Sequence, residues 1–135
     1  MTFTIPGPPQ GKARPRFSGH AYTPEKTKAY EESVAWAYRQ AGGRLLTGPV
    51  RVSVFAYFAV PKSATKAQKA AMLSGGIRPT KRPDLDNICK AIFDGLNGVA
   101  FADDAQIVST YAEKSYSPDP RVEVVVDYEP GAVHD

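Results

Sequence analysis

The stretch that decides the fold reads RPDLDNICKAIFDGLNG over residues 82–98. Its apolar side chains recur every three or four positions, which predicts an amphipathic helix that begins near residue 85 and stops at Gly98. The residues on its apolar face are Leu85, Ile88, Cys89, Ile92, Phe93 and Leu96. Cys89 is therefore expected to be a small buried hydrophobe. Gly95 costs about 1 kcal/mol against alanine inside a helix, which indicates close packing at this position.

The opposite side of this predicted helix carries charged residues. At about 100° per residue, Asp86, Lys90 and Asp94 share the polar side, away from the core face. Asp84 precedes the helix, since Pro83 disfavours a helical start before it. We therefore expect the Asp84 carboxylate to point towards the same opening as that of Asp86.

Each of these polar residues also has an ordinary structural explanation. Asp84 can be an N-cap, and Asp86 can be a first-turn acid that the helix dipole favours. Lys90 follows Asp86 by four residues, the favourable order for an exposed ion pair worth roughly 0.3 kcal/mol. Asp103 and Asp104 can form an acidic turn before a strand. For each residue taken alone, this explanation is the simpler one.

The ordinary explanations weaken when the carboxylates are considered together. Only the short loop GVAFA separates the end of the helix from Asp103 and Asp104, so the pair can return to the same end of the helix. Three or four carboxylates that converge would repel one another unless a cation lay among them. Mg²⁺ suits such ligands, because it binds through few carboxylates and keeps waters that a phosphate can displace. One cysteine and two histidines are too few here for a zinc site.

The formal charge of +3 is distributed unevenly along the chain. Residues 1–82 contain 14 Lys and Arg against 3 Glu, whereas residues 83–135 contain 3 Lys and Arg against 11 Asp and Glu. Both regions can simply be solvated surfaces. Together, however, a basic platform and an acidic cluster are what a metal-dependent nuclease needs, because it must attract phosphates and coordinate divalent ions beside them.

The composition is that of a soluble globular protein. A chain of 135 residues is long enough for one domain that buries roughly two thirds of its unfolded surface, and too short for two ordinary ones. Its longest apolar run, VFAYFAV, is too short to cross a membrane. The N-terminus lacks an apolar signal region and Cys89 has no partner for a disulfide, so a cytoplasmic location is expected.

The sequence predicts an α+β fold: a single domain with a mixed β-sheet of about four strands and packed helices, in the order β-α-β-α-α-β-β. Strands are expected over about residues 3–9, 50–60, 105–116 and 121–128, with helices before residue 41, over 63–73 and over 85–96. Thr23 is expected to cap the first helix, with Pro24 at its first position. Outside these elements we expect a basic loop over about 10–22, a short helical insertion over about 62–76 and a frayed tail over about 129–135.

The predicted basic loop and the segment before the aspartates carry residues suited to DNA. The cations expected to bind phosphates are Lys12, Arg14, Arg16, Lys81 and Arg82. Phe17 can stack on a base or wedge into an opened junction. It can equally lie in the core, beside a loop that is merely solvated.

Two parts of the sequence resemble the RusA family of Holliday junction resolvases, the crossover junction endodeoxyribonucleases. Residues 81–107, KRPDLDNICKAIFDGLNGVAFADDAQI, match the family signature, in which a D-x-D-N-x-x-K helix is followed by a D-D-x-Q segment. GKARPRF at 11–17 and AYTPEKTKAY at 21–30 are similar to the N-terminal region of one branch of the family. The intervening segment 61–80 is longer than in the most compact members.

The resemblance implies roles for the acidic residues. Asp84, Asp86 and Asp104 would be the catalytic carboxylates that bind Mg²⁺, or Mn²⁺ in its place, and Asp103 would be a further metal ligand. Lys90 would be the supporting catalytic cation that stabilises charge on the phosphate.

The resemblance also implies a reaction and a partner. The protein would be a Mg²⁺-dependent endodeoxyribonuclease that resolves Holliday junctions by paired symmetric nicks in DNA recombination and repair. It would act as a homodimer, since two symmetric nicks need two symmetric active sites. Asn87 would orient a metal-bound carboxylate, and Asp94 matches an acidic family position. Two alternatives stay open: a metal-dependent nuclease of flaps, forks or other branched DNA, and a non-catalytic DNA-binding module with a structural metal site.

Overall fold

The computed structural model describes residues 1–12, 16–17, 21–22 and 25–131. A four-stranded mixed sheet in the order β1-β6-β4-β5 confirms the expected single α+β domain. Its strands are β1 (Thr2–Pro6), β4 (Val50–Ala59), β5 (Ile107–Ser117) and β6 (Arg121–Tyr128). β4 runs parallel to β5 and antiparallel to β6, and β6 runs antiparallel to β1. Strands β5 and β1 therefore form the two edges of this sheet.

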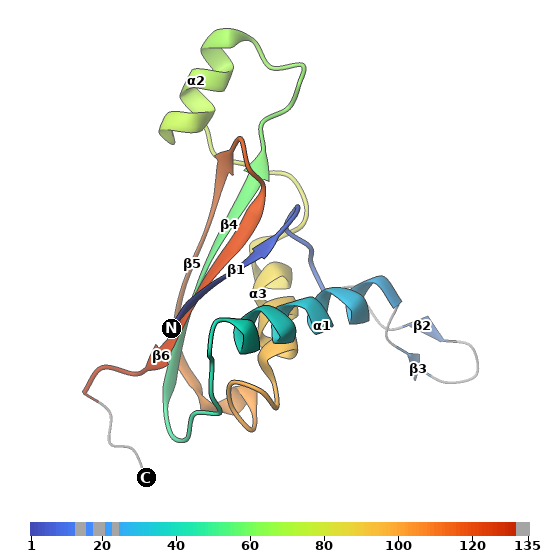
Figure 1. Cartoon of the computed structure of the whole chain (residues 1–135). Coiled ribbons are helices and arrows are strands. Elements are labelled where there is room, and N and C mark those ends of the chain that lie inside the picture. The colour runs from blue at the N-terminus through green and yellow to red at the C-terminus, as the bar shows by residue number, and fades with distance from the viewer. Residues whose placement is uncertain (13–15, 18–20, 23–24, 132–135) are drawn as a thin grey trace.

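Three helices occupy the predicted parts of the chain: α1 (Glu25–Gln40), α2 (Lys66–Ser74) and α3 (Leu85–Leu96). Helices α1 and α3 pack against each other on one side of the sheet, whereas α2 lies beyond the ends of β4 and β5 (Figure 1). Thr23 and Pro24, which we expected at the start of the first helix, lie outside the described residues, as does the end of the tail from 132 to 135.

The hydrophobic core lies between the sheet and helices α1 and α3. Alternate residues of β4 are buried, and the same alternation in β6 places three of its four valines on the same face. The strand residues that contribute are Val50, Val52, Val54, Ala56, Phe58, Val122, Val124 and Val126. The apolar face of α3 meets them through Ile88, Ile92 and Leu96, all fully buried. Cys89 is buried as predicted.

Gly95 sets how closely α3 approaches α1. A Cβ atom at this position would lie 2.7 Å from Cβ of Val34 and 2.9 Å from the carbonyl oxygen of Glu31. Real side chains do not approach one another this closely, so the contact requires glycine. The packing role expected for Gly95 is confirmed, and the contact fixes the direction in which the polar side of α3 faces.

Helix α2 is stabilised by its ends rather than by the core. Thr65 accepts a hydrogen bond from the backbone amide of Gln68, and the Gln68 side chain accepts one from the backbone amide of Thr65. Gly75 ends the helix in a left-handed conformation, with φ of 90°. No residue of α2 is buried. The predicted helix in this region is therefore confirmed, but it contributes little to the core.

One short pair of strands was not predicted. The basic segment contains strands β2 (Arg16–Phe17) and β3 (Ala21–Tyr22), which pair antiparallel. A 3₁₀ turn over Asp104–Gln106 precedes β5, in agreement with the acidic turn considered for Asp103 and Asp104. Strands of two residues are too short to show a hydrophobic period, so the sequence indicated only a loop. Within the part of the chain that the structure describes, no helix has the length and apolarity to span a bilayer.

Candidate active site at the start of helix α3

A lysine on the edge strand holds the segment that leads into α3. The Lys114 ammonium group donates hydrogen bonds to the carbonyl oxygens of Lys81 at 2.6 Å and Pro83 at 3.0 Å. It also lies 4.9 Å from the centre of the Phe58 ring, a cation–π contact. The Arg78 side chain returns to the same strand, donating to the carbonyl oxygen of Lys114 at 3.0 Å. These contacts fix the backbone immediately before the first aspartate.

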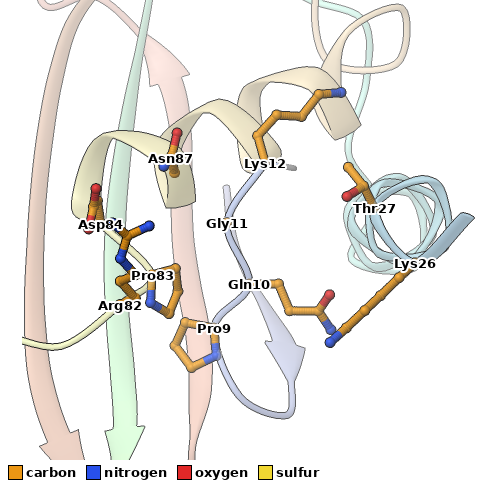
Figure 2. A pocket seen from close by; sticks show the side chains of 10 residues that line it. All are labelled: Pro9, Gln10, Gly11, Lys12, Lys26, Thr27, Arg82, Pro83, Asp84 and Asn87. Carbon is orange, nitrogen blue, oxygen red and sulfur yellow. The ribbon is translucent and has the colours of Figure 1, made fainter. Parts of the chain in front are cut away.

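Asp84 occupies the N-cap position of α3 with an extended backbone, but its side chain makes no capping hydrogen bond. Asp84 therefore occupies the capping position, but its carboxylate does not cap the helix. Asp84 lines a hollow of about 500 Å³ between the beginnings of α1 and α3, which we call the basic hollow. Figure 2 shows Asp84 beside Arg82 and Asn87 on one side of this hollow, with Lys26 on the other.

Asp86 lies in the first turn of α3 and faces a different hollow. Its Oδ1 accepts a hydrogen bond from the backbone amide of Asn87 at 2.9 Å. Together with Lys90 and Asp104, it lines a hollow of about 570 Å³, which we call the acidic hollow. Apolar walls that include Phe93 and Ala112 complete this hollow.

Asp103 and Asp104 form the 3₁₀ turn that brings a second carboxylate to the acidic hollow. Asp103 caps the turn by accepting a hydrogen bond from the backbone amide of Ala105 at 3.3 Å, and the Gln106 side chain completes a capping box. The backbone amide of Asp104 donates to Oδ1 of Asn97 at 3.0 Å. This hydrogen bond fixes the position of Asp104. Because Asp104 lines the acidic hollow beside α3, the prediction that Asp103 and Asp104 return towards the helix is supported.

The pKa of Asp104 is raised above its ordinary value. Its hydrogen bond with the Asp103 side chain is the main cause, followed by burial and by the negative charges of Asp103 and Asp94, while Lys90 opposes the shift. Two carboxylates that approach each other without a cation disfavour ionisation of one of them. A divalent cation would relieve the same repulsion, so the electrostatics of this pair fit a metal ligand.

Lys90 is paired within α3 with Asp94. Its ammonium group lies 3.7 Å from Oδ1 of Asp94, four residues later, and its side chain is 59% exposed. Among the described residues it makes no ion pair with Asp86, so the ordinary explanation that we considered for Lys90, a pair with Asp86, does not hold. An exposed pair of this length contributes little to stability, which leaves Lys90 free to turn towards the acidic hollow that it lines.

Lys12 also reaches Asp94, from the segment that follows β1. Its ammonium group lies 2.6 Å from Oε2 of Glu31 and 3.1 Å from Oδ2 of Asp94, with 18% of the side chain exposed. Burial lowers the pKa of Lys12, but hydrogen bonds to the two carboxylates outweigh it, and the net shift is upward. Its positive charge is thus neutralised within the protein, whereas the sequence alone indicated a phosphate contact.

A match to a known family accompanies this geometry. The family model described as endodeoxyribonuclease RusA matches residues 6–127 of the chain. The chain belongs to the RusA family. A relative, the uncharacterized protein YqaN of Bacillus subtilis (strain 168), is 38% identical over 134 residues, which cover 93% of this chain and 94% of the relative. Membership in the RusA family indicates an endodeoxyribonuclease that acts on branched DNA.

In this RusA-family protein, the residues predicted for the site fall into two neighbouring groups. Asp86, Lys90 and Asp104 line the acidic hollow, with Asp103 bonded to Asp104, whereas Asp84 lines the basic hollow. Within the described ranges, no three Asp, Glu, His or Cys side chains are grouped closely enough to hold a metal ion as they stand. Mg²⁺ needs only one or two protein carboxylates, since waters and substrate oxygens complete its shell. The residues at the acidic hollow therefore suit that ion.

The structure describes only some of the residues predicted to bind DNA in this RusA-family protein. Lys81 and Arg82 are exposed beside Asp84, with the Lys81 ammonium group 5.9 Å from the centre of the Phe58 ring. Arg14 lies outside the described residues, and Arg16 and Phe17 are described only by their place in β2. Sequence reasoning missed Lys114 and Lys26. Nothing in the sequence distinguishes them from solvated lysines, since only the tertiary fold brings them to this end of α3.

Proposed function

We propose that this protein resolves Holliday junctions by paired symmetric nicks, using Mg²⁺, during DNA recombination and repair. The observation that carries the proposal is the acidic hollow, where Asp86, Lys90 and Asp104 come from two separate elements to one opening. Its place in the RusA family supports an endonuclease of branched DNA. Lys81 and Arg82, which are exposed just before Asp84, supply the positive charge that attracts a DNA backbone.

Asp86 and Asp104 would hold the metal, Mg²⁺ or Mn²⁺, with Asp103 as a further ligand and Asp84 contributing from the neighbouring hollow. The raised pKa of Asp104 is consistent with this assignment, because its main cause is the neighbouring Asp103 carboxylate and a cation bound by the two would offset their repulsion. When bound, the metal supplies Lewis-acid chemistry: it lowers the pKa of a coordinated water and offsets charge on the phosphate.

The protein's own groups orient these carboxylates and supply positive charge. The backbone amide of Asn87 holds one oxygen of Asp86, which leaves the other oxygen free to bind a cation. Lys90 is mostly exposed and only loosely paired with Asp94, so it can contact the phosphate as negative charge develops there. Lys114 fixes the backbone before Asp84 through the carbonyl oxygens of Lys81 and Pro83.

We further propose that the protein acts as a homodimer in the cytoplasm. A four-way junction is cut symmetrically only if two equivalent active sites face its two continuous strands, and a two-fold dimer provides that arrangement. Sedimentation of the protein alone and with junction DNA would measure this stoichiometry. A single copy bound to each cleaved junction would contradict the dimer.

A cleavage assay tests the proposed function. Purified protein is incubated with end-labelled four-way junction, flap and linear duplex, each with Mg²⁺ and with a chelator. We expect paired nicks in the junction at symmetric positions, in Mg²⁺ only. Preferred cutting of the flap would favour a nuclease of other branched DNA. Tight junction binding without any cutting would favour a non-catalytic DNA-binding module.

A further inference from the structure

The basic hollow shares no lining residue with the acidic hollow, and the proposed function gives no role to its lysine on α1, Lys26. It measures about 500 Å³ and lies between the beginnings of α1 and α3. Segment 9–12 runs through it, with Lys26 extending from α1 on one side and Arg82 on the other (Figure 2). Its volume falls within the range of roughly 300–1,000 Å³ that is typical of small-ligand pockets.

The lining of the basic hollow contains two cations that have no partner among the described residues. Neither Lys26 nor Arg82 forms an ion pair or hydrogen bond with any residue in the described ranges, although Arg82 shares the hollow with Asp84. Lys12 lines the same hollow but is already paired with two carboxylates. Two unneutralised charges that face each other across a hollow repel one another, and an anion between them would relieve this cost.

The wall between the two cations is held firmly. The backbone amide of Lys12 donates to the carbonyl oxygen of Asn87 at 3.0 Å, which ties segment 9–12 to α3. A Cβ atom at Gly11 would lie 3.0 Å from Cβ of Pro83 and 3.1 Å from Cβ of Asn87, so this segment is pressed against the start of the helix. Packed backbone thus fixes segment 9–12 against the start of α3, next to Arg82.

We propose that the basic hollow binds one backbone phosphate of the DNA strand that is cut, between Lys26 and Arg82. This inference rests on the proposed function and adds Lys26, on α1, to the DNA-binding residues. A phosphate seated here would lie next to Asp84, which is two residues before Asp86 of the acidic hollow. The strand therefore enters over α1 and passes the start of α3 to reach the acidic hollow.

The test compares Lys26→Gln with Lys28→Gln, a matched control on the same helix. Both lysines are exposed, both changes remove one positive charge, and Lys28 does not line the hollow. Affinity for a labelled four-way junction is measured without Mg²⁺ at several salt concentrations. Each phosphate contact contributes roughly 0.7–0.9 to the slope of log affinity against log salt. Because one phosphate is shared by the two cations, we expect Lys26→Gln to lower the slope by part of that amount, Lys26→Gln with Arg82→Gln to lower it by the whole amount, and Lys28→Gln to leave it unchanged.

Two results would overturn the inference, and they are distinguishable. If wild-type protein neither binds nor cuts the junction, both the proposed function and the phosphate site are wrong. If wild-type protein binds and cuts, but Lys26→Gln and Lys28→Gln behave alike, only the phosphate site is wrong and the charge acts at long range. Thermal unfolding of each variant, expected to match that of the wild type, excludes a change in folding as the cause.

Discussion

The ammonium group of Lys114 donates a hydrogen bond to the carbonyl oxygen of Pro83 at 3.0 Å, and so joins the edge strand β5 to the residue that precedes Asp84. A second bond to the carbonyl oxygen of Lys81 makes the link bidentate. The segment between α2 and α3 has no regular secondary structure of its own. Lys114 is therefore a positioning residue for the first aspartate of the site, rather than a group that touches substrate.

Lys114→Met tests this positioning role. Loss of two hydrogen bonds from a charged donor should reduce the free energy of unfolding by about 1–2 kcal/mol. Misplacement of Asp84 should slow single-turnover cleavage by roughly tenfold to a hundredfold and raise the Mg²⁺ concentration needed for half-maximal rate. Lys28→Met, on the surface of α1, is the control and should change neither. If the free energy of unfolding falls but the Mg²⁺ concentration for half-maximal rate does not change, Lys114 has only a structural role.

Lys12→Met tests whether Lys12 stabilises the fold through its internal ion pairs or contacts DNA. The change leaves Glu31 and Asp94 close together and mostly buried, so we expect a loss of about 2 kcal/mol in unfolding free energy. Because the folded pKa of Lys12 is raised, this contribution is fully present below the ordinary lysine pKa and disappears only as pH rises through the folded value. Adding Glu31→Gln should restore part of the loss. A junction-binding salt slope lower by about one would instead show that Lys12 contacts a phosphate.

Lys90→Ala should slow cleavage without weakening DNA binding. One cation placed at developing charge is typically worth roughly 3 kcal/mol, or about a hundredfold in rate. Its pair with Asp94 is exposed and long, so stability should change by less than about 0.5 kcal/mol. Single-turnover rates at saturating protein provide the measurement. An unchanged rate would leave Lys90 with only its surface ion pair.

Tyr30 gives the protein a specific sensitivity to alkali. Burial raises the pKa of its hydroxyl to about 12, slightly offset by the backbone of Gln10, and the hydroxyl has no hydrogen-bond partner of ordinary geometry among the described residues. The folded state keeps this proton while the unfolded state loses it near pH 10, so stability falls as pH rises from 10 to 12. At pH 11 the loss from this group should be about 1 kcal/mol. Urea unfolding of Tyr30→Phe should show no such loss and no deficit at pH 7.

The main elements of the fold could be predicted because each carries a local pattern. The alternation in β4 and the apolar spacing in α3 act within one segment, so the sequence alone located both. The order β1-β6-β4-β5 and the parallel pairing of β4 with β5 depend on contacts between distant segments, which no local pattern encodes. The pairing of β2 with β3 was not predicted, because strands of two residues are too short to carry a local pattern.

The sequence allowed us to predict which residues belong to the candidate site, but not how their side chains are divided between the two hollows. The short loop after α3 made it foreseeable that Asp104 returns to the helix that carries Asp86. The separation of Asp84 into the basic hollow depends on how Lys114 and Gly11 hold the preceding backbone, and these contacts span many residues. Lys12 looked like a phosphate ligand because its partners, Glu31 and Asp94, lie far from it in the chain.

We propose that the acidic hollow holds a catalytic metal through Asp86 and Asp104. Replacement by asparagine keeps size and shape while it removes one negative charge. Since the pKa of Asp104 is raised, its ionised form is penalised at neutral pH, and Asp104→Asn should hold or raise metal-free stability. Junction affinity without Mg²⁺ should also hold or increase, because a negative group near the phosphates is lost.

The most direct measurement is single-turnover cleavage of a four-way junction in Mg²⁺ by wild-type protein, Asp86→Asn and Asp104→Asn. Asp119→Asn, which removes one carboxylate charge in the turn between β5 and β6, is the matched control. We expect cleavage by Asp86→Asn and Asp104→Asn to fall by several orders of magnitude, and cleavage by Asp119→Asn to equal that of the wild type. Cleavage by Asp86→Asn at close to the wild-type rate would contradict the account.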